Sequence, residues 1–130
     1  MSPNESETPK EGPAEERGPS GPALVDIGEF ARIELKTGRV VAAEPHPDAD
    51  RLVVMKVDVG EAVPRQIVAG ILKDWEPDDL VGRTLVVVCN LKPARLRGVE
   101  SQGMMLAVRG ADRIWPVTIE GEAAPGTRVT

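Results

Sequence analysis

Short runs of aliphatic residues, separated by turn-forming residues, recur along most of the sequence and set the strongest limit on its fold. Runs of roughly four to eight residues rich in valine, isoleucine and leucine predict β strands. Several such strands in a chain of 130 residues predict one domain, a barrel or a sandwich. The predicted strands are Gly38–Ala43, Leu52–Val59, Gln66–Ile71, Thr84–Leu91 and Met104–Val108, with Ile114–Ile119 as a later addition.

Two short helices are predicted beside these strands. Pro77–Gly82 lies between the third and fourth strands and has proline near its start and glycine at its end, as a single helical turn does. A helix in this position is typical of the OB-fold, a five-stranded, partly open barrel. Asp26 can cap a second helix that runs to Arg32, in which the expected packed residues are Ile27, Phe30, Ala31 and Ile33. We therefore predict an all-β protein: a five-stranded OB-fold barrel with a short N-terminal helix, a short helix between strands 3 and 4, and a C-terminal strand extension.

The first 22 residues differ in composition from the rest. They contain five prolines and five glutamates and have no large aliphatic residue after Met1, so they cannot bury enough apolar surface to offset the entropy of ordering. We predict a disordered acidic tail at 1–22 and a domain at 23–130. Without the tail, the chain carries 16 acidic and 14 basic groups, a net charge of −2 compared with −5 for the whole chain.

Charge and aromatic content limit how the protein could bind nucleic acid. A net charge of −5 argues against a grip that depends on bulk positive charge, so any basic site must be local. The only aromatic residues are Phe30, Trp75 and Trp115, too few for the stacking platforms that read single-stranded bases.

Compartment and redox state follow from what the sequence lacks. Cys89 is the only cysteine and lies in an apolar run, so it cannot form an internal disulfide and is expected to pack in a buried strand. The N-terminus has no basic start with an apolar run, and no stretch of about 18 apolar residues occurs. We expect a cytoplasmic protein with no membrane partner.

The sequence offers no set of residues for catalysis or metal binding. His46, Asp48 and Asp50 could be metal ligands, but prolines and aspartates between two strands are more typical of a turn in which Asp oxygens accept backbone N–H groups. No second histidine or cysteine cluster supports zinc. No nucleophile–base pair or phosphate-binding glycine motif is recognisable, so we predict no enzyme activity, no metal and no cofactor.

The segment Asn90–Met104 contains charged and polar residues that a simple connection between two strands does not need. Its three cations, Lys92, Arg95 and Arg97, lie within six residues with no acid among them. Pro93 and Gly98 can fix the course of the chain. Arginine can bind a phosphate with two N–H groups, and amide and hydroxyl side chains suit sugars or base edges. The residues with such side chains are Asn90, Ser101 and Gln102. The alternative is that the segment is a solvated connecting loop with no ligand.

Read as a whole, Asn90–Met104 resembles the signature of the tRNA-binding domain family, which includes the C-terminal domain of bacterial methionyl-tRNA synthetases and free-standing tRNA-binding proteins. The resemblance extends over about Ile27 to Val108 and continues weakly to Pro125–Val129, which looks like the end of the synthetase-type domain. Two departures are Ala69, where many members have serine, and Lys36–Arg39, which replaces a common Arg-x-Gly-Lys arrangement. Other matching segments are Gly38–Val41, His46–Leu52, Val57–Gly60, Arg65–Ile71 and Leu80–Arg83.

The resemblance implies a non-catalytic protein that binds tRNA by its shape and backbone, stand-alone or as an accessory to an aminoacyl-tRNA synthetase. It also implies a homodimer, with methionyl-tRNA synthetase as a candidate partner. The alternative is a dimeric peptide-binding chaperone like CsaA, a relative with the same fold that lacks most of this signature. The expected tRNA-binding residues are Lys36, Arg39, Asn90, Lys92, Arg95, Arg97, Ser101, Gln102 and Met104.

Overall fold

The computed structural model describes residues 22–130, so the predicted tail at 1–22 lies, except for its last residue, outside the described residues. The chain divides after Arg32 into two compact units. In the first unit, helix α1 (Ile27–Phe30) is one turn long and begins where predicted, with the Asp26 backbone N–H donating to Glu29 Oε1 at 2.9 Å. The predicted packing of its apolar side chains is wrong: Ile27 and Phe30 are 82% and 45% exposed, and Ala31 and Ile33 are exposed as well. A single turn presents too little apolar surface to pack an apolar face by itself.

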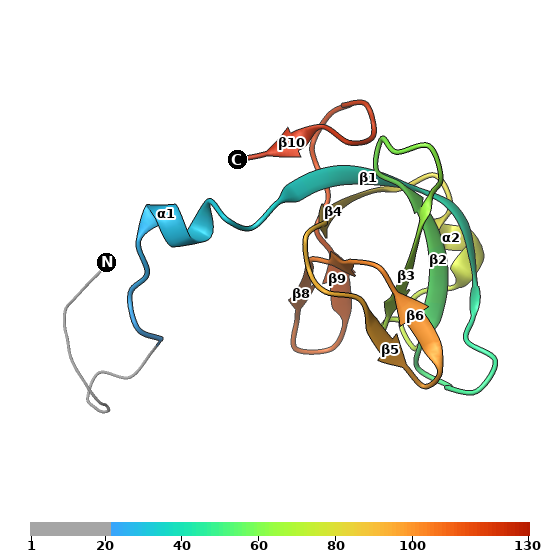
Figure 1. The fold of residues 1–130 in the computed structure, drawn as a ribbon. Coiled ribbons are helices and arrows are strands. Elements are labelled where there is room, and N and C mark those ends of the chain that lie inside the picture. The colour runs from blue at the N-terminus through green and yellow to red at the C-terminus, as the bar shows by residue number, and fades with distance from the viewer. Residues whose placement is uncertain (1–21) are drawn as a thin grey trace. The chain divides into compact units, whose positions relative to one another are not determined.

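The second unit is built on an antiparallel sheet whose strands follow the order β3–β2–β1–β4–β7, with β10 also paired to β1 (Figure 1). Strand β1 pairs with β4 through Leu35–Arg39 and with β2 through Arg39–Pro45. A bulge between Val40 and Ala42 bends it, which lets one long strand serve both parts of the barrel. The strands of this sheet are β1 (Leu35–Pro45), β2 (Val53–Asp58), β3 (Arg65–Ala69), β4 (Thr84–Val88), β7 (Met104–Met105) and β10 (Arg128–Val129).

The barrel closes between β3 and the chain just before β7. Gln66 and Gln102 exchange two bonds: the Gln102 backbone N–H donates to Gln66 O at 2.7 Å, and the Gln66 N–H donates to Gln102 Oε1 at 2.8 Å. Beside them, the Val68 N–H donates to Ser101 Oγ at 3.0 Å. One backbone bond and two bonds to side-chain oxygens therefore complete this seam in place of a continuous backbone ladder, as in a nearly closed barrel. The predicted OB-fold is confirmed.

The barrel interior is filled by side chains from β1, β2, β3 and β4 and closed by α2 (Pro77–Leu80). This helix lies between β3 and β4, as predicted, and its only buried residue is Leu80, with no exposed surface. Its end is fixed to β1, because the Gly82 N–H donates to Val40 O at 2.8 Å. Cys89 packs against the same core, and this burial raises the pKa of its thiol. The core therefore fixes the strands whose connecting loops carry the candidate site.

After β7 the chain leaves the sheet and forms a second hairpin. The predicted strand Met104–Val108 is divided at Leu106, whose N–H donates to Val86 O while its own carbonyl accepts from the Val117 N–H. This change of partner turns the chain from β4 toward β9. The remaining strands are β8 (Ala107–Arg109) and β9 (Ile114–Pro116) in this hairpin, and β5 (Ala94–Leu96) and β6 (Val99–Ser101) in another.

Candidate nucleic-acid interface

The predicted basic loop is a β hairpin. Strands β5 and β6 pair with Leu96 opposite Val99, leaving Arg97 and Gly98 as a two-residue turn. Both turn residues have positive φ, 53° and 87°, the sign that a type I′ turn requires and the one that matches the twist of the flanking strands. Arg97 is the one non-glycine residue with positive φ in the described part of the chain. The turn therefore presents a cation at the tip of a rigid hairpin.

The three cations of the hairpin are exposed and keep most of their hydrogen-bonding capacity. Arg95 Nη1 donates to Gly98 O at 2.8 Å, and Arg97 Nη2 lies 3.4 Å from Asp48 O. Both partners are neutral carbonyls, so neither bond cancels the charge, and each guanidinium has further N–H donors. Within residues 22–130 no ion pair joins Lys92, Arg95 or Arg97 to an acid, even though Glu100 stands opposite Arg95 in the hairpin register.

The connection between β1 and β2, the 46–52 loop, holds the tip of this hairpin. His46 is 5% exposed, and its two ring nitrogens have different partners. Nδ1 accepts the Asp48 N–H at 2.9 Å and Nε2 donates to Leu96 O at 3.0 Å, which assigns the proton of the neutral ring to Nε2. The predicted turn is present, but the acceptor that the structure shows is the imidazole and not an Asp carboxylate. His46 is therefore a positioning residue for the hairpin.

Arg51, which was not among the predicted site residues, joins the site through this loop. A cavity of about 380 Å³ is lined by Arg51 and Arg97 together with other residues of the 46–52 loop, among them the acids Asp48 and Asp50. In an OB-fold the loop between the first two strands and the loop before the last strand form part of the ligand-binding surface. We call the surface formed by residues 46–52 and 92–101 the hairpin face.

The two predicted cations of β1 lie elsewhere. Lys36 is near the start of β1, 3.8 Å from Glu34, whereas the hairpin tip contacts residues that follow the end of this strand. Arg39 is three positions further, so it points to the other side of the strand, and it stands opposite Asp58 and Thr84. Lys36 and Arg39 are therefore not placed beside the hairpin tip.

Of the predicted polar residues, three are engaged in holding the fold. Asn90 Oδ1 accepts the Glu34 N–H at 2.8 Å, and Gln102 Oε1 belongs to the barrel seam. Ser101 is 5% exposed, and its hydroxyl both accepts the Val68 N–H and donates to Gly103 O at 2.9 Å. Met104 is 48% exposed. The side-chain groups of Asn90, Ser101 and Gln102 thus position the hairpin and the barrel edge.

Arg65 is another cation near the hairpin base, but its charge is compensated. Its guanidinium donates to both carboxylate oxygens of Glu61, at 2.7 and 2.9 Å, and to the carbonyls of Cys89 and Gln102. The hydrogen bond between the two side chains raises the pKa of Arg65 and lowers that of Glu61. Arg65 ties β3 to the chain on both sides of the hairpin and adds little positive potential.

Comparison with known proteins identifies the family. The model of the tRNA binding domain family matches residues 35–128, which include the barrel and the hairpin face. The chain belongs to the tRNA-binding domain family. This match confirms the resemblance found in the sequence, and because it extends past β9 to β10 it includes most of the weaker similarity at 125–129.

Curated relatives of this tRNA-binding domain are methionine–tRNA ligases. The chain is 44% identical to that of Thermococcus kodakarensis over 81% of its own length and 14% of the relative's, and 42% identical to that of Thermotoga maritima over 82% and 17%. The chain thus spans less than a fifth of these enzymes. The similarity concerns one domain of each.

Solved structures support the same fold. A methionyl-tRNA synthetase-related protein from Pyrococcus horikoshii superposes with a TM-score of 0.77 at 35% identity, over 83% of this chain and 99% of that one. The chaperone CsaA from Bacillus anthracis superposes with a TM-score of 0.74 at 29% identity, over 83% and 100%. Relatives of both predicted kinds therefore share the barrel, and the choice between the functions depends on the site.

Proposed function

We propose that this member of the tRNA-binding domain family binds tRNA through the hairpin face, by contacts to the backbone, and catalyses no reaction. The observation that carries this proposal is the pair of arginines on β5 and its turn. They are exposed and two positions apart, and among residues 22–130 their hydrogen bonds go to neutral carbonyls. Guanidinium groups on a paired hairpin that are not held in ion pairs suit phosphate oxygens, which arginine can bind with two N–H groups.

The roles of the remaining predicted residues follow from where they lie. Lys92, at the base of the hairpin, would add a third phosphate contact. Met104 would contact the tRNA through its apolar side chain. Ser101, Asn90 and Gln102 would act by holding the hairpin in place. Lys36 and Arg39 would bind tRNA only if it extends from the hairpin face along the barrel, as a large folded RNA can.

We place the protein in the cytoplasm, alone or as an accessory to an aminoacyl-tRNA synthetase. Its relatives are methionine–tRNA ligases, so a methionyl-tRNA synthetase is the partner that this similarity favours. No helix among residues 22–130 is long and apolar enough to cross a membrane.

We also propose that the protein is a homodimer, which would present two hairpin faces to one tRNA and increase the affinity without further charge. Large apolar residues on the first unit are uncovered: Leu24 is 90% exposed and Ile27 82%. Sedimentation equilibrium at micromolar concentration should therefore give twice the mass of the chain, and Ile27→Asp should reduce it because a charge cannot be buried in an apolar contact. A monomer mass for the unaltered chain at these concentrations would refute the dimer.

The peptide-binding alternative can be separated from tRNA binding in one assay. We expect a labelled tRNA to be shifted by the protein, with different tRNAs bound within roughly five-fold of one another because phosphate contacts carry no sequence information. An unfolded apolar peptide in large excess should not displace the tRNA. Displacement of the tRNA by the peptide, or binding of the peptide alone, would favour the chaperone function.

A further inference from the structure

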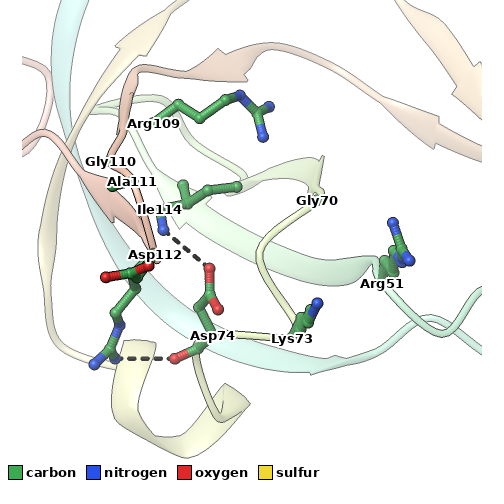
Figure 2. A pocket seen from close by; sticks show the side chains of 10 residues that line it. Arg51, Gly70, Lys73, Asp74, Arg109, Gly110, Ala111, Asp112 and Ile114 are labelled. Atoms are coloured by element: carbon green, nitrogen blue, oxygen red, sulfur yellow. Dashed lines mark hydrogen bonds between the residues drawn. The ribbon is translucent and has the colours of Figure 1, made fainter.

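A second cavity lies next to the hairpin face and has its own set of cations. It has a volume of about 350 Å³ and lies between the β8–β9 turn and the chain that follows β3. Figure 2 shows Arg51, Lys73 and Arg109 around it, each from a different segment. Three segments that are distant in sequence thus bring cations to one hollow.

The charges around this cavity do not cancel. All three cations are exposed, and within residues 22–130 no ion pair joins any of them to an acid. Two acids, Asp74 and Asp112, also line the cavity, and Asp74 Oδ2 accepts the Ile114 N–H at 2.9 Å (Figure 2). With Arg113 the lining has four cations against these two acids, a net charge of +2. A hollow with a surplus of cations attracts an anion.

The wall of the cavity is held by hydrogen bonds and ring contacts. The Gly110 N–H donates to Arg113 O at 2.8 Å, and a Cβ at position 110 would lie only 2.9 Å from that oxygen, so the turn needs glycine. The Arg113 guanidinium lies 4.5 Å from the ring centre of Trp75 and 4.7 Å from that of Trp115, and it donates to Asp74 O at 2.9 Å. Cation–π contacts of this kind hold the side chain in place, so Arg113 forms part of the wall. The cations available to contact a ligand are Arg51, Lys73 and Arg109.

Arg51 connects this cavity to the hairpin face, because it lines both this cavity and the one that it shares with Arg97. A chain of phosphates that contacts Arg97 could therefore continue past Arg51 to Lys73 and Arg109. A folded RNA supplies phosphates in such a series, whereas a single small anion would need only one of the two cavities.

We propose that the cavity between Lys73 and Arg109 is a second phosphate-binding site, occupied by the backbone of the same tRNA that the hairpin face binds. The proposal rests on the proposed function, since it assigns further contacts to the same ligand. The chemistry is that of a phosphate monoanion held by ammonium and guanidinium groups, and its source is the RNA backbone rather than inorganic phosphate.

The test is a tRNA gel shift over a salt series with the double variant Lys73→Gln/Arg109→Gln. Arg51 is left unchanged because it also belongs to the hairpin face. We expect about 10- to 100-fold weaker binding at low salt. The plot of log affinity against log salt should be shallower by about 1.4 to 1.8, since each of the two lost phosphate contacts contributes about 0.7 to 0.9 to this slope. The matched control is Arg128→Gln on β10, an exposed cation at the other end of the barrel (Figure 1), which should leave both values unchanged.

The outcomes separate the two proposals. If the parent chain binds no tRNA, the proposed function fails. If the parent binds and hairpin variants lose binding, but Lys73→Gln/Arg109→Gln binds like the parent, only the second site is refuted. Inorganic phosphate titrated to the parent should show no saturation below millimolar concentration; saturation at micromolar concentration would refute an RNA-backbone site. If the double variant unfolds, the single variants Lys73→Gln and Arg109→Gln carry the same test, each with about half the change in slope.

Discussion

The double variant Arg95→Gln/Arg97→Asn should bind tRNA about 100-fold more weakly than the parent chain at low salt. Each arginine offers its charge to a phosphate, and a hydrogen bond to a charged group contributes about 1.5 kcal/mol or more, which corresponds to roughly ten-fold in affinity. The substitutions remove charge and keep polar side chains on an exposed hairpin. Gel shifts with several tRNAs would measure the effect, which should be of similar size for each.

The choice of asparagine at position 97 protects this test from a folding artefact. Arg97 has a φ of 53°, and asparagine followed by glycine is the preferred pair in a type I′ turn, so Arg97→Asn should keep or improve the hairpin. Arg97→Lys is the matched control: it retains the charge without the fork and should lose only part of the affinity. A doubly substituted hairpin that binds like the parent would show that tRNA is held elsewhere.

A second large effect is expected in the core, from Leu80→Ala. Leu80 is the one buried residue of α2 and has no exposed surface, and truncating a buried leucine costs about 3 kcal/mol through lost burial and the cavity left behind. Urea unfolding should show this decrease in the free energy of unfolding. The tRNA affinity of the folded protein should not change, because α2 is not part of the hairpin face.

The neighbouring residue supplies the control for this prediction. Val81 is 47% exposed, so Val81→Ala should change the free energy of unfolding by less than about 0.5 kcal/mol. Equal losses for Leu80→Ala and Val81→Ala would contradict the assignment of Leu80 as the residue that anchors the helix in the barrel.

Much of the barrel could be predicted from sequence because buried strands carry a strong signal. The aliphatic runs at Leu52–Val59 and Thr84–Leu91 contain β2 and β4, although each strand ends earlier than the run. The helix α2 could be predicted as well, because Pro77 marks its start and Gly82 follows its end. These signals are strong because a strand buried on one face needs an apolar residue at every second position, and a strand buried on both faces needs one at nearly every position.

The hairpin β5–β6 was predicted only as a loop, for a physical reason. The residues of β5 are all exposed, so no face needs apolar side chains and no alternation marks the strand. Its turn is Arg97–Gly98, which lacks the Asn-Gly or Asp-Gly signal of a two-residue hairpin. For α1 the error was the reverse: apolar residues were predicted to be packed and are exposed. An apolar residue in a short helix need not pack within its own chain.

The composition of the site depended on tertiary contacts that the sequence did not reveal. The local cluster of Lys92, Arg95 and Arg97 was visible, but the approach of the 46–52 loop to the hairpin tip is set by the two hydrogen bonds of the buried His46. That approach brings in Arg51, which lies 46 residues before Arg97 in sequence. Conversely, Ser101 looked like an RNA contact in sequence and is buried in the barrel seam.

The salt dependence of tRNA affinity, measured side by side for the parent chain and Arg95→Gln/Arg97→Asn, tests the central claim most directly. If the hairpin face binds phosphates, log affinity of the parent should fall linearly with log salt, and the slope of the variant should be shallower by about 1.4 to 1.8 because two phosphate contacts are lost. Parallel lines for the two proteins would mean that these arginines do not contact the RNA backbone, and this would contradict the account.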